Sequence, residues 1–212
     1  MTVLAELAAA VITGDHIHAD DLTRQAIAEG LPPKGILDDG LIAGMSVVGD
    51  RFRDHEIFLP DVLLAARAMY AGMDLLKPLL IKEGVPSLGR VLIGSVRGDL
   101  HDIGKNLVGI MLKGAGFDVI DLGHDVAPER MVTTAVEQRA SVIGMSALLT
   151  TTMPAMREVV ELLRERQLAG SIKTVVGGAP VTQAFARDIG ADAYGFDAAN
   201  AVDVIKDLIG RR

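Results

Sequence analysis

The chain has 212 residues, of which 50% are hydrophobic and 3% aromatic, and it carries a formal net charge of -7 without any cysteine. The acidic balance argues against nucleic acid as the main partner, because phosphate binding requires a basic surface. The lack of cysteine excludes disulfides and thiolate metal sites. The apolar opening contains Glu6 and lacks a basic leader, and no apolar run reaches the length of about eighteen residues that spans a membrane. We therefore expect a cytoplasmic protein without a membrane partner.

Residues 1–82 carry apolar positions at helical spacing, with almost no strand-like alternation. The spacing predicts helices near residues 2–12, 19–30, 34–52 and 60–81. Asp15 is a candidate helix cap, and Pro60 suits the first turn of a helix. Four helices with short connections predict a small bundle. His16 and His18 fall in a predicted loop without further candidate ligands, so we expect them to be surface residues.

Residues 83–89 have the composition of a linker, and the pattern changes after them. Short β-branched runs then alternate with helical stretches, the runs being RVLIGSV, DVIDLG, SVIGMS, KTVVGG and ADAYG. Continuous apolar strands of this kind predict a parallel sheet covered by helices on both faces. We therefore predict an α + α/β chain, with a four-helix-bundle cap at residues 1–86. A flavodoxin- or Rossmann-like domain with a five-stranded parallel sheet is predicted at residues 87–212.

In a sheet of this kind, ligands bind outside the carboxyl ends of the strands. The first strand is followed by GDLHDIG, the second by GHDVAPE and the third by SALLTTT. The fourth and fifth strands end in GGAP and YGF. Each segment also has an ordinary structural interpretation: a loop histidine is usually solvated, and a Gly-Gly pair permits a tight turn. A serine at a strand end can satisfy a backbone group, and threonines can cap the following helix.

Three of these segments form a spaced pattern: D-x-H-x-x-G, then S-x-L after residues 105–145, then G-G after residues 149–176. This pattern resembles the cobalamin-binding signature of methionine synthase, corrinoid methyl carriers and cobalamin mutases. The matching residues are Asp99, His101, Gly104, Ser146, Leu148, Gly177 and Gly178. The resemblance implies cobalamin as the cofactor, in its methylcobalamin and Co(I) forms.

The resemblance assigns His101 as the lower ligand of the cobalt, in place of the cofactor's own dimethylbenzimidazole. Cobalt favours imidazole, and a ligating histidine normally has a carboxylate on its other nitrogen. By resemblance, Asp99 and Ser146 form this hydrogen-bond relay behind the ligand. The displaced nucleotide tail would enter a slot in the sheet domain. The implied cofactor-binding residues are Gly98, Asp99, Leu100, His101, Asp102, Ile103, Gly104, Ser146, Leu148, Leu149, Thr150, Gly177, Gly178, Ala179 and Tyr194.

The helical half is similar to the cap that precedes the corrinoid domain in methionine synthase and in small corrinoid proteins. The best match is VVGDRFRDHEIFLPDVLLAARAM, residues 47–69. In that family an aromatic residue and a leucine cover the upper face of the corrin, and here they map to Phe52 and Leu59. Periodicity alone equally allows both to be bundle core. The usual acidic stretch between them is replaced by Arg53-Asp54-His55-Glu56, which bears on partner binding and not on cobalt ligation.

The resemblance therefore implies a methyl-carrying corrinoid protein of a multi-component methyltransferase system, without room for a substrate domain. A substrate:corrinoid methyltransferase would load it, and a corrinoid:acceptor methyltransferase would unload it to tetrahydrofolate or a thiol, with a reductive activase as a third partner. Three alternatives stay open: a cobalamin-dependent sensor, an adenosylcobalamin mutase subunit, and a mononuclear metal hydrolase built on Asp99, His101 and His124. The donor, whether a methylamine, methanol, a methoxyaromatic or a betaine, would be chosen by the partner.

Overall fold

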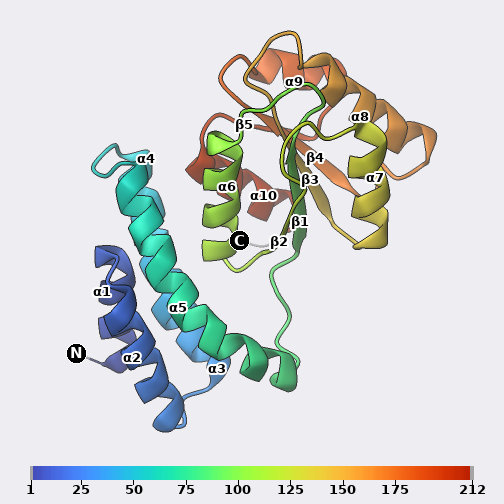
Figure 1. The fold of residues 1–212 in the computed structure, drawn as a ribbon. Coiled ribbons are helices and arrows are strands. Elements are labelled where there is room, and N and C mark those ends of the chain that lie inside the picture. The colour runs from blue at the N-terminus through green and yellow to red at the C-terminus, as the bar shows by residue number, and fades with distance from the viewer. Residues whose placement is uncertain (1, 211–212) are drawn as a thin grey trace. The chain divides into compact units, whose positions relative to one another are not determined.

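The computed structural model describes residues 2–210, which divide into two compact units, residues 2–87 with 114–116 and residues 88–113 with 117–210 (Figure 1). The first unit is helical, and the second is built on a five-stranded sheet. Within the described residues, no helix combines the length and the apolar character needed to cross a membrane.

The helical unit is a bundle with an aliphatic core. Its elements are α1 (Val3–Thr13), α2 (His16–Ala28), α3 (Pro33–Gly35), the π-helical η1 (Ile36–Ile42), α4 (Ala43–Arg53) and α5 (Leu59–Glu83). α2 packs against α1 and α5, and α1 also packs against η1 and α4. The largest side chains buried between them are Leu7, Ile36, Leu41, Met69 and Leu76. The helical composition predicted from the sequence is confirmed for this unit.

The helix predicted at residues 34–52 is confirmed, because α3, η1 and α4 follow one another without a break, but its middle part is π-helical and not α-helical. Two glycines there lie close to α1. A Cβ atom on Gly40 would lie 2.7 Å from Cδ2 of Leu7, and one on Gly44 would lie 2.8 Å from the backbone oxygen of Ala8. A π-helical turn holds one more residue per hydrogen-bonded ring than an α-turn. The apolar stripe continues on both sides of η1, so hydrophobic periodicity could not reveal the π-helical segment.

The start of α2 also differs from the prediction. Asp15 caps the helix, and its carboxylate accepts a hydrogen bond from the backbone N–H of His18 at 3.1 Å. The cap moves the start to His16, ahead of the predicted residue 19. His16 and His18 therefore lie in the first helical turn and not in a loop. The predicted position of Pro60 in the first turn of α5 is confirmed.

The second unit is a parallel sheet with helices on both faces. Its strands are β1 (Arg90–Ser95), β2 (Asp118–Asp121), β3 (Val142–Ser146), β4 (Lys173–Gly177) and β5 (Ala193–Gly195). Its helices are α6 (Ile103–Gly114), α7 (Pro128–Glu137), α8 (Pro154–Glu165), α9 (Gln183–Ile189) and α10 (Ala198–Leu208). The strand order is β2-β1-β3-β4-β5, and every neighbouring pair is parallel. α6 and α10 lie on one face, and α7 and α8 lie on the other (Figure 1).

The core between the sheet and α7, α8 and α9 fixes the strands that carry the site. Leu92, Ile143 and Val176 from the three central strands pack with Met131 and Met156 from the helices, and none of these side chains is exposed. The strand order reverses between β1 and β3, which is where ligands bind in open sheets of this type. Because Ser95 pairs with Ser146 in register, the loops that follow β1 and β3 begin side by side.

Candidate functional site

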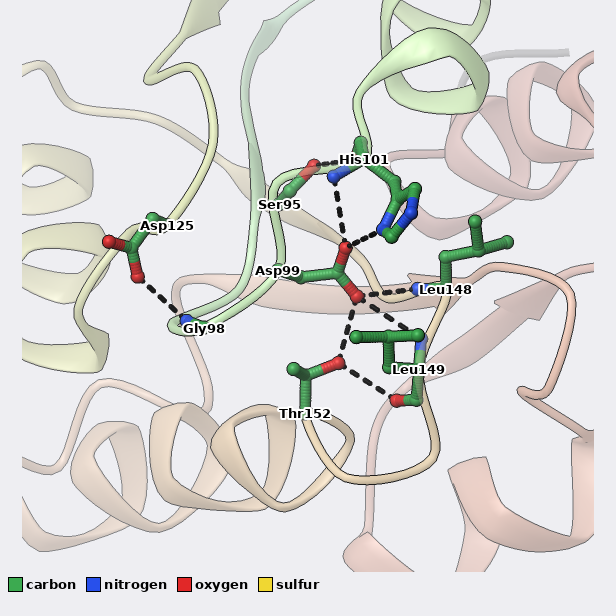
Figure 2. Close-up of polar contacts among 8 residues, drawn as sticks. All are labelled: Ser95, Gly98, Asp99, His101, Asp125, Leu148, Leu149 and Thr152. Carbon is green, nitrogen blue, oxygen red and sulfur yellow. Dashed lines mark hydrogen bonds and ion pairs between the residues drawn. The ribbon is translucent and has the colours of Figure 1, made fainter.

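The loop between β1 and α6 carries His101 at the carboxyl edge of the sheet (Figure 2). The loop turns at Gly98, whose φ of 82° is in the left-handed region that glycine adopts easily. The hydroxyl of Ser95 is buried and donates a hydrogen bond to the backbone oxygen of His101 at 2.7 Å. The end of the strand thus holds the histidine's backbone in place.

Asp99 is completely buried, and both of its carboxylate oxygens are occupied (Figure 2). Oδ1 accepts a hydrogen bond from the backbone N–H of His101 at 3.1 Å and lies 2.8 Å from His101 Nδ1. Oδ2 accepts from the backbone N–H groups of Leu148 at 2.7 Å and Leu149 at 3.2 Å. The hydroxyl of Thr152 donates to Oδ2 at 2.8 Å. One carboxylate therefore joins the loop after β1 to the loop after β3.

These contacts decide the charge of Asp99 and the tautomer of the histidine. Burial alone would raise the pKa of Asp99, but the hydrogen bonds from the Leu148 N–H, His101 and Thr152 outweigh it and hold the pKa well below its usual range. Asp99 is therefore a carboxylate at neutral pH and can only accept hydrogen bonds. The proton in its contact with His101 must sit on Nδ1, which leaves Nε2 of the neutral ring with a free lone pair.

The side chains of Asp99 and His101 differ sharply in their exposure to solvent. The His101 side chain is 52% exposed, whereas that of Asp99 is 0% exposed. A histidine whose Nδ1 is fixed by a carboxylate and whose Nε2 is accessible has the arrangement of a metal ligand. In the part of the chain that the structure describes, no group of three or more His, Cys, Asp or Glu side chains is placed to hold a metal ion. The site therefore suits a metal that brings its remaining ligands with it.

The lack of a three-ligand group among the described residues also removes the hydrolase alternative. That hypothesis needs Asp99, His101 and His124 on one metal ion, but both oxygens of Asp99 are already engaged by donors from the protein. His124 lies exposed on the loop after β2. The three-ligand site of that alternative is therefore not formed by the described residues.

The hydroxyl that contacts Asp99 is not the one expected from the sequence. Ser146 is the last residue of β3, and its backbone oxygen accepts a hydrogen bond from the N–H of Val96 at 3.0 Å. Within residues 2–210, the hydroxyl partner of Asp99 is Thr152, because the chain returns to the carboxylate in the turn that precedes α8. The threonine run was a visible signal, but the sequence indicated helix capping and could not show which threonine reaches Asp99.

The glycines of the pattern serve two different needs. A Cβ atom on Gly178, where φ is 128°, would lie 1.9 Å from the backbone oxygen of Ala147, and one on Gly177 would lie 2.9 Å from that of Gly195. The close approach of the loops after β3, β4 and β5 thus requires both glycines. A Cβ atom on Gly104 would meet nothing within 4 Å. No neighbouring group in the chain requires a glycine there, so the open space suits a ligand.

The remaining predicted residues surround this edge with uncovered apolar surface. Leu100 and Ile103 are 66% and 70% exposed, and Leu148 and Leu149 are 44% and 42% exposed. Clustered exposed apolar side chains mark binding surfaces. The other predicted residues have these positions: Thr150 and Ala179 are exposed, while Asp102 and Tyr194 are half-buried. Phe52 and Leu59 are half-buried in the helical unit, near the end of α4 and at the start of α5.

The buried Lys105 forms an ion pair beside the site that the sequence did not reveal. It is buried in the first turn of α6, and its Nζ contacts the two carboxylate oxygens of Asp121 at 2.6 and 2.5 Å and Oδ1 of Asn106 at 2.6 Å. This ion pair ties the start of α6, and with it the end of the His101 loop, to the end of β2. A lysine in the first turn of a helix is usually solvated, so nothing in the sequence distinguished this one.

The geometry defines a class of protein. The site offers one oriented imidazole nitrogen, an uncovered apolar rim and open space at Gly104, all at the strand-order reversal of a parallel sheet. A corrin would bring most of the cobalt's ligands with it and would need a single nitrogen from the protein. These residues therefore fit cobalamin, with His101 as the group that would hold the metal from below.

Comparisons with known proteins agree with this class. Two models described as B12 binding domains match residues 89–203 and 3–77. A corrinoid protein from Desulfitobacterium hafniense is 42% identical over 214 residues, covering 100% of this chain and 99% of the relative. Dimethylamine corrinoid protein 1 from Methanosarcina acetivorans is 46% identical over 208 residues, covering 98% of this chain and 97% of the relative. This chain belongs to the B12-binding corrinoid proteins, and cobalamin is its cofactor.

A solved structure extends the comparison to the fold. The methanol:cobalamin methyltransferase complex MtaBC from Methanosarcina barkeri contains a chain that matches with a TM-score of 0.88 and 32% identity, covering 98% of this chain and 80% of that chain. The similarity spans both units of the protein. None of these findings supports the alternative of a cobalamin-dependent sensor.

We expect the Asp99→Asn variant to destabilise the cobalamin-free protein in a pH-dependent way. The folded-state pKa of Asp99 is lowered, so its stabilisation is fully present above the unfolded-state pKa of about 4 and is lost as the pH falls below that value. An amide satisfies the buried donors poorly, which costs about 2–4 kcal/mol of unfolding free energy near neutral pH. Urea unfolding at several pH values should show the deficit shrinking between about pH 5 and about pH 3.

The control for that experiment is Asp188→Asn, which removes a side chain that is 67% exposed and paired with Arg157. Its unfolding free energy should follow the wild-type pH dependence, because an exposed pair contributes little. A deficit of Asp99→Asn that stays constant with pH would contradict the charge assigned to this carboxylate.

Alanine at the two kinds of glycine should separate folding from cofactor binding. Gly178→Ala should lower the thermal unfolding temperature, because the new Cβ overlaps the Ala147 backbone. Gly104→Ala should keep or slightly raise it, since alanine favours a helix by up to about 1 kcal/mol. The same variant should bind hydroxocobalamin about ten-fold more weakly, as overpacking of about 1.4 kcal/mol would produce. Wild-type affinity in Gly104→Ala would show that its open space does not receive the cofactor.

Proposed function

We propose that this chain carries a methyl group on the cobalt of its cobalamin between two methyltransferases. One enzyme takes the methyl group from a small methylated donor, and the second passes it to an acceptor such as tetrahydrofolate or a thiol. The chain is then a carrier subunit of a methyltransferase system and not a complete enzyme. The observation that carries the proposal is the accessible His101 ring, which Asp99 holds through Nδ1 at 2.8 Å.

The names of the relatives support this function. One relative, which matches over 98% of this chain, is a dimethylamine corrinoid protein. One matched structure is a methanol:cobalamin methyltransferase complex. Both connect a corrinoid protein of this size and fold to small methylated compounds. The matched chain in the methanol complex supports a methyltransferase as a direct partner of this protein.

When bound, the cobalt supplies a centre that accepts and releases a methyl group. The chain's own residues would keep the imidazole nitrogen of His101 in position for that chemistry. Asp99 fixes the tautomer and the direction of the His101 ring, and Ser95 holds the backbone of the same residue. Leu100 and Ile103 provide apolar surface that would cover the cofactor and exclude water from its lower side.

The partners complete the proposed system. The donor-specific methyltransferase sets whether a methylamine, methanol, a methoxyaromatic or a betaine supplies the methyl group. A corrinoid:acceptor methyltransferase and a reductive activase are the other two proposed partners. The cytoplasmic location expected from the sequence is part of the same proposal. Incubating the reduced, cobalamin-loaded protein with candidate methyltransferases and each class of donor, and following the corrin absorbance, tests the carrier function. No spectral change with any donor would contradict it.

The His101→Ala variant tests the ligand itself. Wild-type protein loaded with cobalamin in the Co(II) state should show electron paramagnetic resonance splitting from a histidine nitrogen, and isotopically labelled histidine should alter that splitting. His101→Ala should lose it. His124→Ala, which changes an exposed histidine on the neighbouring loop, should keep the wild-type spectrum. A spectrum that shows only benzimidazole nitrogen and does not change in His101→Ala would overturn the assignment.

We also propose that Phe52 and Leu59 shield the upper face of the corrin and move aside with the bundle for each partner. The similarity of residues 47–69 to the corrinoid cap and the B12-domain match at residues 3–77 support this role. In protein loaded with methylcobalamin, Phe52→Ala with Leu59→Ala should raise the yield of photolysis, because an escaping methyl radical is less hindered. Ile17→Ala, at an apolar residue that is 66% exposed on α2, is the control. An unchanged photolysis yield in the double variant would count against shielding.

A further inference from the structure

Asp125 holds the His101 loop from the side opposite Asp99's carboxylate contacts. It lies on the loop between β2 and α7, and its Oδ1 accepts a hydrogen bond from the backbone N–H of Gly98 at 2.7 Å (Figure 2). The backbone N–H of Asp125 also donates to the backbone oxygen of Asp99 at 3.0 Å. One residue therefore bonds to two consecutive residues of the loop that precedes His101, Gly98 and Asp99.

The backbone of Asp125 is itself unusual. Its φ of 53° is in the left-handed region, which few residues other than glycine, asparagine and aspartate adopt. The next residue, Val126, is anchored to β1, because its N–H donates to the backbone oxygen of Ser95 at 3.0 Å. Between this anchor and the turn at Gly98, the left-handed conformation lets both the N–H and the side chain of Asp125 reach the same turn.

From this geometry we infer that Asp125 is a positioning residue for the cobalt ligand. The inference rests on the proposed role of His101. The effect passes from Asp125 to the backbone of Gly98 and Asp99, and then through the Asp99 carboxylate to His101 Nδ1. Loss of the Asp125 side chain leaves the Asp99 carboxylate bonded to Leu148 and Thr152 and leaves the backbone N–H that donates to Asp99, but it removes the acceptor that holds the Gly98 N–H. The turn before His101 would then be less fixed, the direction of His101 Nε2 would vary, and this nitrogen would hold the cobalt less well.

Arg97, which precedes Gly98 in the same turn, makes a side-chain contact of a different kind. Arg97 Nη2 lies 2.7 Å from a carboxylate oxygen of Glu158, with the two side chains 50% and 42% exposed. This pair joins side chains at the surface and does not bond to the backbone of the turn. Exposed pairs of this type contribute little to stability. Glu158→Gln is therefore a matched control, since it changes an acidic partner of the same turn without touching the path to His101.

Three substitutions at position 125 separate its side-chain acceptor from its backbone conformation. Asp125→Ala removes the acceptor and strains the left-handed backbone, whereas Asp125→Gly removes the acceptor and relieves the strain. Asp125→Asn keeps an acceptor oxygen and tolerates the conformation. Titration of the cobalamin-free protein with hydroxocobalamin should give about ten-fold weaker binding in the alanine and glycine variants, as loss of an outer partner of a metal-ligating histidine typically does. Asp125→Asn and Glu158→Gln should bind as the wild type does.

A double-mutant cycle with His101→Ala decides whether Asp125 acts through the histidine. In the His101→Ala background, Asp125→Gly should cause no further loss of hydroxocobalamin affinity. An equal loss in both backgrounds would show a general structural role and overturn the inference. If His101→Ala binds as the wild type does, the ligand assignment fails and the inference fails with it. If His101→Ala weakens binding and Asp125→Gly does not, only the inference fails.

Amide hydrogen exchange of the cobalamin-free protein gives a readout that needs no cofactor. The Gly98 amide should exchange faster in Asp125→Gly than in the wild type and Asp125→Asn, because its acceptor is gone. An unchanged Gly98 exchange rate in Asp125→Gly would show that the bond does not hold the turn, and would overturn the inference.

Discussion

The buried carboxylate of Asp99 is the interaction on which the site depends. A charged group with 0% exposure is costly unless donors replace its hydration, and here backbone N–H groups, a hydroxyl and an imidazole do so. The same bonds lower its pKa and fix its charge. With both oxygens occupied by protein donors, Asp99 has no position left for a metal ion. Its effect on cobalt must therefore pass through the tautomer and direction of His101.

The sheet brings the donors of Asp99 together. Ser95 at the end of β1 pairs with Ser146 at the end of β3, so the loops that follow these strands start as neighbours. The first loop supplies the carboxylate and the histidine, and the second supplies the N–H groups of Leu148 and Leu149. A reversal of strand order between β1 and β3 leaves room at this edge for a ligand. The position of the site is thus a consequence of topology, and its chemistry is a consequence of what the two loops carry.

The sequence predicted two kinds of feature: elements that are buried in a regular pattern, and site residues that lie at a fixed spacing. Strands covered on both faces appear as continuous apolar runs, so the sheet was visible, and the spaced pattern led to His101. The sequence could not predict contacts between segments that are far apart along the chain and meet only in the folded protein. Thr152 follows two other threonines, and only the turn before α8 selects it as the partner of Asp99. Likewise, the apolar stripe continues across η1, and the burial of Lys105 depends on Asp121 at the end of another strand.

The glycines of one sequence pattern show how far such a pattern can be interpreted. At Gly178 the chain itself forbids a side chain, because the Ala147 oxygen occupies the place of a Cβ atom. At Gly104 nothing in the chain lies within 4 Å of that place. The two residues look equivalent in the sequence, but the first builds the loops and the second leaves space beside them. His101 serves both purposes with one side chain. Its Nδ1 is part of the buried hydrogen-bond network, and because the side chain is 52% exposed, its Nε2 is available to a ligand. The site is therefore a rigid base of internal bonds beneath a surface that the chain leaves uncovered, which is the form that a large preassembled metal cofactor requires.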